Sequence, residues 1–291
     1  MGVDSLNDNY SVGQKRDNVR VLQRFERFEF VHDDVACVAR DLTDGVDVVF
    51  HEAGQPGVRA SWREQFSEYL TRNVAATQQL LEAAVSARTP RVVFASSSSV
   101  YGNAPTYPVG EGERPRPFSP YGVTKLAAEH LCSAYAENTG LSVVSLRYFT
   151  AYGPRQRPDM AIYRLIESAL SGVPFTQFGD GSQVRDFTFV GDIVRATLAA
   201  GDADVPAGIV ANVAGGALCS LADLIEIVGG TVGATVTIEP HEHAHGDVRC
   251  TSGAIDLARR AFNWEPTVAL PEGLARQAEW HRSVIARSPA L

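Results

Sequence analysis

Four short apolar runs alternate with longer amphipathic segments in the first half of this chain. The runs are RFEFV (27–31), VDVVF (46–50), RVVFA (91–95) and LSVVSLRYF (141–149), and the amphipathic segments include 66–87 and 121–139. Strands that alternate with helices favour a parallel sheet, because each connection crosses over the sheet. The runs are apolar nearly throughout, as expected of strands covered on both faces. The pattern predicts an α/β fold, a Rossmann-like doubly wound parallel sheet.

The second half of the chain differs in composition and in the length of its predicted elements. After about residue 150, Gly- and Pro-rich loops separate shorter elements, as in YGPRQRPDMA (152–161), FGDGSQVRDFTFVGD (178–192) and PHEHAHGD (240–247). Long loops beside a nucleotide-type fold usually bind a ligand. We therefore predict a nucleotide-binding domain over 1–145 and a smaller α/β substrate-binding domain over 146–291, with some elements interleaved.

Charge and cysteine content exclude several classes of protein. The formal net charge is -8 and no block of five like charges occurs, so a nucleic-acid surface is not expected and an anionic substrate needs locally placed arginines. Four scattered cysteines, with no C-x-x-C, favour reduced thiols in the cytoplasm. No signal pattern and no apolar run of membrane-spanning length is present. We expect a soluble, cytoplasmic protein.

The stretch YGVTK (121–125) and the upstream SSSSVYG (96–102) carry the chemistry. Tyr121 and Lys125 are four residues apart in a predicted helix and share a face. A phenol titrates near pH 10, so a tyrosine base needs an adjacent cation such as Lys125. Y-x-x-x-K alone is more often a surface pair. The serine run at the end of a strand reverses those odds, because open parallel sheets bind ligands at the carboxyl ends of their strands. Ser97 is positioned to hydrogen-bond the phenol and a substrate oxygen.

From residue 3 to about 282 the chain resembles extended short-chain dehydrogenase/reductases of the NAD-dependent nucleotide-sugar epimerase/dehydratase family. The similarity rests on these motifs, in order: HEAGQPGVRAS (51–61), SSSSVYG, YGVTK, RYFTAYGPRQRPDMA (147–161), GDGSQVRDFTFV (179–190), NVAGG (212–216), GDVRCT (246–251) and FNWEPTVALPEGL (262–274). The resemblance implies that Ser97, Tyr121 and Lys125 are the catalytic triad. Tyr121 would take a proton from a sugar hydroxyl while hydride passes to NAD. The 4-ketosugar would turn over and regain the hydride on its other face, which inverts C4.

The resemblance also implies a UDP-sugar substrate. Arg185 and Arg249 would pair with the diphosphate, and Asp247 with the ribose. Thr150 stands where UDP-glucose epimerases usually carry Asn, and Thr150 with Arg157 and the following PDMA resembles UDP-glucuronate 4-epimerases. Arg157 would pair with the sugar carboxylate and Thr150 would hydrogen-bond it. UDP-glucose is the alternative substrate.

The family pattern assigns ten positions to the NAD site. They are Asp4, Asp34, Val35, Ala53, Gly54, Gln55, Asn73, Tyr121, Lys125 and Tyr148. Asp4 matches the acidic residue that ends the second strand of the fold, so the glycine-rich phosphate loop is expected some 20 residues before Met1. Three interpretations follow. Met1 is an internal residue of a longer active enzyme, which we favour; the product is truncated and inert; or the chain is a redox-inactive sugar-binding or partner protein.

Three further sequence patterns each allow two interpretations. Gly229–Gly233 has glycine spacing but follows a predicted helix over 221–228, so it is interpreted as a helix C-terminus rather than a phosphate loop. His241, His243 and His245 alternate; a polar loop is favoured over a metal site, and no metal is predicted. By resemblance, helices at about 66–87 and 121–139 pair with a second copy in a homodimer, although both could equally be internal.

Overall fold

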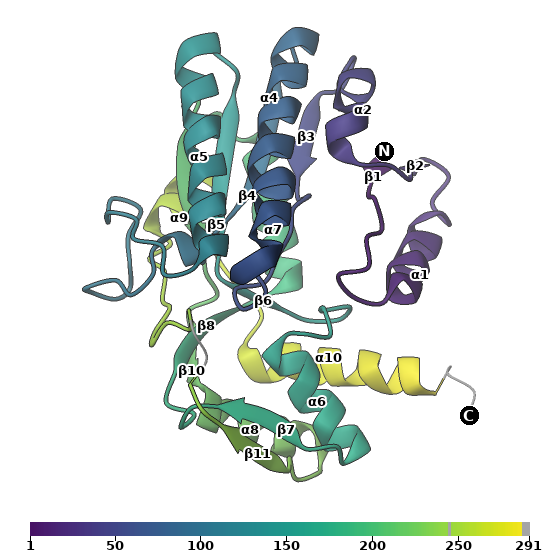
Figure 1. The fold of residues 1–291 in the computed structure, drawn as a ribbon, viewed down its shortest axis with the longest axis vertical. Coiled ribbons are helices and arrows are strands. Elements are labelled where there is room, and N and C mark those ends of the chain that lie inside the picture. The colour runs from purple at the N-terminus through teal and green to yellow at the C-terminus, as the bar shows by residue number, and fades with distance from the viewer. Residues whose placement is uncertain (244–245, 287–291) are drawn as a thin grey trace.

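A computed structural model describes residues 1–243 and 246–286 of the chain. Its main sheet has four parallel strands in the order β3, β4, β5, β9, with bounds Val48–His51, Arg91–Ser97, Val143–Tyr148 and Ile209–Val213 (Figure 1). The predicted α/β fold with a parallel sheet is confirmed. Strand β9 comes from the second half of the sequence, so the chain returns to the first sheet after leaving it.

Helices cover both faces of this sheet. Alternate residues of β4 face opposite sides: Val92 and Phe94 pack against α4 (Ala76–Ala87) and α5 (Pro120–Thr139), whereas Val93 packs against α7 (Val190–Asp202) and α9 (Asp256–Phe262). Helix α2 (Val35–Leu42) lies against α4 through Ala39. This two-sided burial explains why the strands are almost wholly apolar.

A smaller lobe lies below the main sheet in Figure 1. It contains a three-stranded sheet, in the order β10 (Ala217–Ser220), β8 (Val184–Phe189) and β6 (Thr150–Tyr152), and a parallel pair, β11 (Ile238–His241) with β7 (Phe175–Phe178). Helices α6 (Ala161–Ser171), α8 (Leu221–Val232) and α10 (Leu270–Ile285) pack on these strands around one apolar core. Within the described ranges, no helix has the length and apolarity needed to cross a membrane.

The N-terminal residues form a separate two-stranded parallel sheet. Strand β1 (Gly2–Val3) pairs with β2 (Phe30–Val31), and α1 (Val12–Leu22) connects them. The predicted strand over 27–31 is therefore shorter than expected. Its ladder is limited to two residues because β1 offers only two partners.

Two predicted helices have different bounds from those expected. The segment 66–87 is not one regular helix: α3 (Phe66–Tyr69) runs into a π-helical segment, Leu70–Ala75, before α4 begins. The predicted end of α8 at Val228 is also wrong, because the helix includes Gly229 and Gly230 and ends at Gly233, whose φ of 78° makes it a left-handed C-cap. The helix C-terminus predicted for this glycine run is nevertheless present.

Candidate active site

The predicted triad lies where β4 ends and α5 begins. Ser97 is the last residue of β4, and its Oγ accepts a hydrogen bond from the Ser99 amide at 3.1 Å; that bond uses a lone pair and not the hydroxyl proton. Helix α5 starts at Pro120, with Ser119 Oγ accepting from the Gly122 amide at 3.1 Å. Tyr121 and Lys125 therefore stand in the first two turns, next to the end of β4.

Gly122 makes this close approach possible. A Cβ at position 122 would lie 2.5 Å from the Ser99 carbonyl oxygen and 3.1 Å from the Pro117 Cβ. The first turn of α5 therefore rests directly on the turn that follows Ser97. A larger residue at position 122 would shift the first turn of α5, which carries Tyr121, relative to Ser99.

Lys125 is buried and is held by the strand below it. Its Nζ donates to the Ala95 carbonyl oxygen at 2.6 Å and lies 4.9 Å from the centroid of the Phe94 ring. The missing side chain of Gly54 leaves room beside it, since a Cβ at residue 54 would lie 3.7 Å from this Nζ. Two of the predicted cofactor positions are thus adjacent in space.

A hydrogen-bonded chain fixes the π-helical segment against α5. Asn73 Nδ2 donates to the Gln55 carbonyl and to Thr124 Oγ1, both at 3.0 Å, and the Thr124 hydroxyl donates to the Tyr121 carbonyl. Asn73 Oδ1 accepts from the Gln55 amide at 2.6 Å. Asn73 is buried with all its polar atoms bonded to protein, so its observed contacts connect Gln55 with the helix that carries Tyr121.

His51 supports the same segment from β3, a role that sequence reasoning missed. Thr77 Oγ1 gives its proton to the Asn73 carbonyl at 2.7 Å, so it accepts from Nε2 of His51 at 2.9 Å. Burial, together with the Lys125 charge, lowers the pKa of His51 to about 3, so the ring is neutral at physiological pH. The sequence signal that could have pointed to His51 is its position directly after the predicted strand VDVVF (46–50).

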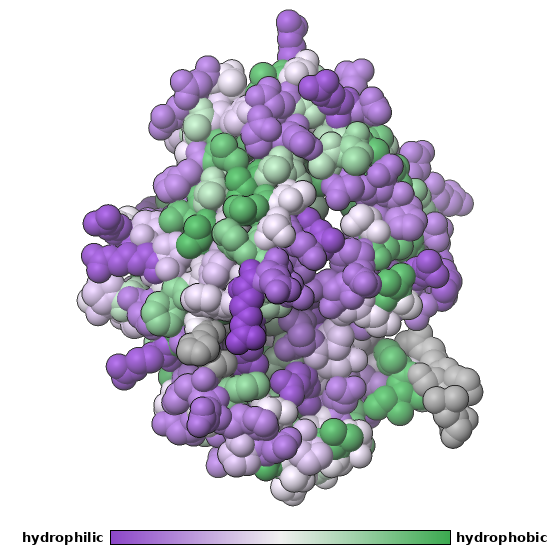
Figure 2. Space-filling view, in the orientation of Figure 1, coloured by the Kyte–Doolittle hydropathy of each residue, from purple (hydrophilic) through white to green (hydrophobic). Residues whose placement is uncertain are grey.

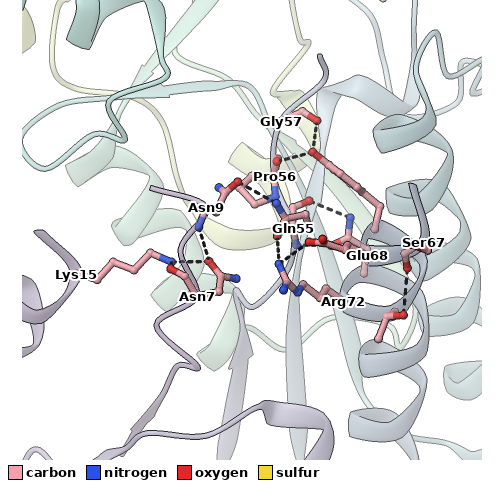
Figure 3. Close-up of polar contacts among 12 residues, drawn as sticks. Asn7, Asn9, Lys15, Gln55, Pro56, Gly57, Ser67, Glu68 and Arg72 are labelled. Atoms are coloured by element: carbon pink, nitrogen blue, oxygen red, sulfur yellow. Dashed lines mark hydrogen bonds and ion pairs between the residues drawn. The ribbon is translucent and has the colours of Figure 1, made fainter. Parts of the chain in front are cut away.

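Gln55 joins the N-terminal loop to the site (Figure 3). Its Nε2 donates to Asn9 Oδ1 at 2.9 Å, and its Oε1 accepts from Arg72 at 2.6 Å. Lys15 in turn donates to the carbonyl and side-chain oxygens of Asn7, both at 2.8 Å. The loop that follows Asp4 is therefore tied to the loop that follows β3.

Tyr148 and Glu52 form a polar pair at the ends of β5 and β3. The Tyr148 hydroxyl lies 3.0 Å from Glu52 Oε1 and 2.7 Å from Thr197 Oγ1. Burial raises the pKa of Tyr148 well above 10, so the hydroxyl keeps its proton. Ala53 and Gly54 follow Glu52 in the same loop.

The predicted adenine-side residues lie at the ends of β1 and β2. Asp4 Oδ1 accepts from the Leu6 amide at 2.6 Å, which turns the chain after β1. Asp34 caps α2 through the Ala36 amide at 2.9 Å, and Val35 is the first residue of that helix. Asp34 thus has a structural function at the position predicted for cofactor contact.

The predicted diphosphate residues gather around a separate pocket. A cavity of about 500 Å³ is lined by residues from three segments, including Asn103, Tyr107, Gln183, Asp247, Arg249 and Cys250. Arg185 forms an ion pair with Asp247, and the Arg249 amide donates to Asn103 Oδ1 at 3.0 Å.

Arg59 Nη2 lies 3.9 Å from Asp247 and its guanidinium stacks 4.0 Å from the Phe178 ring centroid. Arg59 was missed as a candidate, although it stands within the motif HEAGQPGVRAS.

Arg157 lies near the predicted triad. It makes two 2.9 Å hydrogen bonds to the carboxylate of Asp159, and Tyr121 and Tyr10 lie within electrostatic range of its charge. Burial lowers the pKa of Arg157, but the bonds to Asp159 outweigh that effect and the net shift is upward. Thr150 opens β6, opposite Phe187 of β8. The predicted contacts of Arg157 and Thr150 with the sugar carboxylate stay predictions.

The histidine pattern gives no metal cluster in the described part of the chain. His241 ends β11, where its ring packs 5.7 Å from that of Phe178, and His243 lies against Gly179. His245 falls outside the described residues.

Comparison with known proteins identifies the family. The model of the NAD dependent epimerase/dehydratase family matches residues 2–214. This chain belongs to that family. It is 36% identical over 285 residues to an uncharacterized UDP-glucose epimerase, YtcB, of Bacillus subtilis, covering 98% of this chain and 90% of that protein.

Two further relatives are similarly close. The UDP-glucuronate 4-epimerase of Thermodesulfobacterium geofontis is 36% identical over 293 residues, covering 98% of this chain and 89% of that protein. The crystal structure of UDP-glucuronic acid 4-epimerase from Bacillus cereus, in complex with UDP-glucuronic acid and NAD, superimposes with a TM-score of 0.94 at 39% identity, covering 97% of this chain and 90% of that one. The family predicted from the motifs is confirmed.

The residues present fit the reactive half of NAD. Gly54 is exposed, and a Cβ there would lie 2.8 Å from Asn73 Oδ1, so glycine lets the loop lie against Asn73 and Lys125 while its backbone stays accessible. The Tyr121 hydroxyl and Lys125 ammonium supply donors suited to a ribose and a carboxamide. For the pyrophosphate, β3 is followed by a G-x-x-G spacing, Gly54 to Gly57, but residues 58–62 separate it from the 3₁₀ turn Arg63–Gln65. In 1–243 and 246–286, no strand therefore passes directly through such a turn into a helix N-terminus.

Proposed function

We propose that this protein catalyses the NAD-dependent inversion of C4 of a UDP-sugar, and that UDP-glucuronate is its substrate. The observation that carries the proposal is the placement of Ser97, Tyr121 and Lys125 at one sheet edge, together with a separate pocket lined in part by arginine. The relatives whose names include UDP-glucuronate 4-epimerase support the choice of sugar.

The chain's own side chains supply the acid–base chemistry. When bound, NAD supplies a hydride acceptor and donor for C4. Tyr121 removes the proton of the C4 hydroxyl and later returns it, while Ser97 donates a hydrogen bond to the same oxygen. Lys125 places a positive charge near the phenol, and its bond to the Ala95 carbonyl holds that charge in place. General acid–base catalysis of this kind contributes about 10²- to 10⁴-fold to the rate.

The nucleotide end is proposed to bind through charge. Arg185 and Arg59 both face one carboxylate, Asp247, and Arg249 lines the same pocket as Asp247, which leaves excess positive charge for a diphosphate. Tyr107 offers a ring in the same pocket for the base. Arg157, near Tyr121, binds the carboxylate of the sugar.

A homodimer is the proposed assembly, with α5 and the segment before α4 in the interface. Hydrophobic side chains gather on the face over α4 and α5 (Figure 2). Leu70 and Val123 in these helices, and Trp62 and Phe118 beside them, are each at least 41% exposed, and the last three line an apolar groove of about 670 Å³. A second copy would cover these side chains. We place the protein in the cytoplasm, because its four cysteines are free thiols.

The test combines binding with turnover. NAD released on denaturation is measured first, UDP and NAD affinities are measured by calorimetry, and UDP-glucuronate and UDP-glucose are then followed by NMR for the 4-epimer. We expect bound NAD, turnover of UDP-glucuronate, and a loss of about 10²- to 10⁴-fold in kcat in Tyr121→Phe with UDP affinity retained. A folded chain that binds UDP but neither binds NAD nor forms an epimer would contradict the proposal.

A further inference from the structure

A buried ion pair lies directly behind the candidate active site, and the proposed chemistry does not use it. Glu129 of α5 and Arg147 of β5 are 3% and 4% exposed. Arg147 Nη2 donates to Glu129 Oε1 at 2.6 Å and its Nε donates to Oε2 at 3.0 Å, so the pair is bidentate. Ser96 of β4 adds a third bond, with its hydroxyl 2.7 Å from Glu129 Oε2.

The remaining donor of Arg147 extends this network across the sheet. Its Nη1 donates to the Tyr101 hydroxyl at 2.7 Å, and that hydroxyl donates to Asn212 Oδ1, also at 2.7 Å. The guanidinium also stacks 4.7 Å from the Tyr101 ring centroid. The network therefore joins β4, β5, β9, α5 and the turn after Ser97.

The register of the sheet connects this network to the candidate site. Ser96, Arg147 and Asn212 are direct partners across β4, β5 and β9, so they form one row on the face covered by α5. Ser96 immediately precedes Ser97. Glu129 lies one helical turn after Lys125 and two turns after Tyr121, on the same side of α5.

Stability does not by itself explain a network of this kind. Removing two charges from water offsets most of their attraction, and well-packed apolar residues of the same volume are usually as stabilising. An apolar contact, however, tolerates sliding and rotation of a helix, whereas a bidentate guanidinium–carboxylate pair accepts one geometry. This directional requirement fixes the height and rotation of α5 on the sheet.

We propose that Glu129 and Arg147 are positioning residues that set the register between α5 and β4, and thereby the position of Tyr121 and Lys125 relative to Ser97. The proposal rests on the proposed function, because the reaction requires these three side chains to meet. Neither Glu129 nor Arg147 touches substrate in this role.

The test replaces the whole pair so that no buried charge is left alone. In the double variant Glu129→Leu/Arg147→Met, we expect a folded protein with a melting temperature within a few degrees of the wild type. Its kcat for the 4-epimerisation should fall by about 10- to 100-fold, since a misplacement near 1 Å costs up to about 100-fold, while KM and the UDP affinity stay within about twofold. Cys132→Ala is the matched control, because Cys132 packs the next turn of α5 into the apolar core without joining the network; its kcat should stay within about twofold.

A second readout does not depend on turnover. Amide hydrogen exchange over residues 120–125 should accelerate at least tenfold in the double variant and not in Cys132→Ala, while exchange in α10 stays unchanged. Wild-type kcat, or unchanged exchange over 120–125, in a folded double variant would overturn the positioning role. An inactive wild type would instead contradict the proposed function, and the exchange measurement would still decide the role of the pair.

Discussion

The proposed catalytic end of the sheet and the proposed nucleotide pocket are built in different ways. Ser97 and Lys125 are 9% and 7% exposed and belong to a strand and a helix that share a core. Arg59, Arg249 and Tyr107 stand on loops and are more than one-third exposed. Groups that react must be held within a fraction of an ångström, whereas groups that bind a flexible diphosphate can adjust. Changes in the first region should therefore lower kcat, and changes in the second should raise KM.

The largest effect is expected from Gly122→Ala. The added methyl would lie 2.5 Å from the Ser99 carbonyl oxygen, so the first turn of α5 has to move and Tyr121 moves with it. A displacement of about 1 Å lowers kcat by about 100-fold, with little change in the affinity for UDP. Steady-state kinetics and calorimetry measure the two quantities.

Gly230→Ala provides the matched control for this change. Gly230 is also helical, and a Cβ there meets no atom within 4 Å. Its kcat should equal that of the wild type. If Gly122→Ala were as active as Gly230→Ala, the contact of α5 with Ser99 would not set the position of Tyr121.

Arg185→Leu should produce the opposite kinetic pattern. Removing a charge-assisted bond to a phosphate weakens binding by about 1.5–3 kcal/mol, so KM should rise about 10- to 100-fold while kcat changes only a few fold. Arg59→Leu should have a smaller effect, because that side chain is half exposed and 3.9 Å from Asp247. Arg24→Leu, at an exposed position far along the chain from the pocket residues, should leave KM unchanged. An unchanged KM in Arg185→Leu would exclude Arg185 from the diphosphate site.

A smaller effect is expected at Asp159, whose carboxylate now pairs with Arg157. A sugar carboxylate has to compete with Asp159 for the same guanidinium, and a partly exposed pair of this kind contributes only about 0.2–1 kcal/mol. In Asp159→Asn, the KM for UDP-glucuronate should fall up to about fivefold, whereas the KM for UDP-glucose should not change. Arg157→Leu should raise the KM for UDP-glucuronate alone. Equal changes in the KM values for UDP-glucuronate and UDP-glucose would show that Arg157 does not bind the sugar carboxylate.

The elements that the sequence predicts well are those with a local cause. The parallel strands follow from two-sided burial of runs such as RVVFA, and the start of α5 follows from Ser119 and Pro120. The location of Ser97, Tyr121 and Lys125 at the end of one strand and the start of one helix could be predicted because all three stand in recognisable motifs; their catalytic role stays a prediction. In each case the signal lies within a few residues of the feature.

The features that sequence reasoning missed depend on contacts between distant segments. The π-helical turn in 66–87 is held by Asn73, whose partners Gln55 and Thr124 lie 18 and 51 positions away. The Glu129–Arg147 pair forms only when α5 and β5 meet, and Arg59 approaches Asp247 only when two distant loops lie side by side. Hydrophobic periodicity and motif spacing carry no information on contacts between segments that are far apart in the sequence.

Two buried histidines extend the comparison to stability and pH. His51 beside the site has Thr77 as a partner, whereas the Nε2 of His281 in α10 has no hydrogen-bond partner among the described residues and its ring packs 4.4 Å from that of Tyr163. Burial lowers the pKa of His281 to about 4, below its ordinary value of 6.5. The unfolded chain therefore binds more protons than the folded one between pH 6.5 and 4. The free energy of unfolding should fall by about 3 kcal/mol as the pH drops through this window.

His281→Phe should remove the contribution of His281 to this dependence, because no group at position 281 can then take up a proton; the contribution of His51 stays. Denaturant unfolding at pH 7.5 and 4.5 measures the effect. At pH 7.5 the variant should be at least as stable as the wild type, since it no longer buries an unpaired nitrogen, and its advantage should grow by about 2–3 kcal/mol at pH 4.5. His51→Phe is the contrasting variant: it loses the bond to Thr77 and should be destabilised by about 1 kcal/mol or more already at pH 7.5. If the free energy of unfolding of His281→Phe fell between pH 7.5 and 4.5 by as much as that of the wild type, His281 would not contribute to the acid sensitivity of the fold.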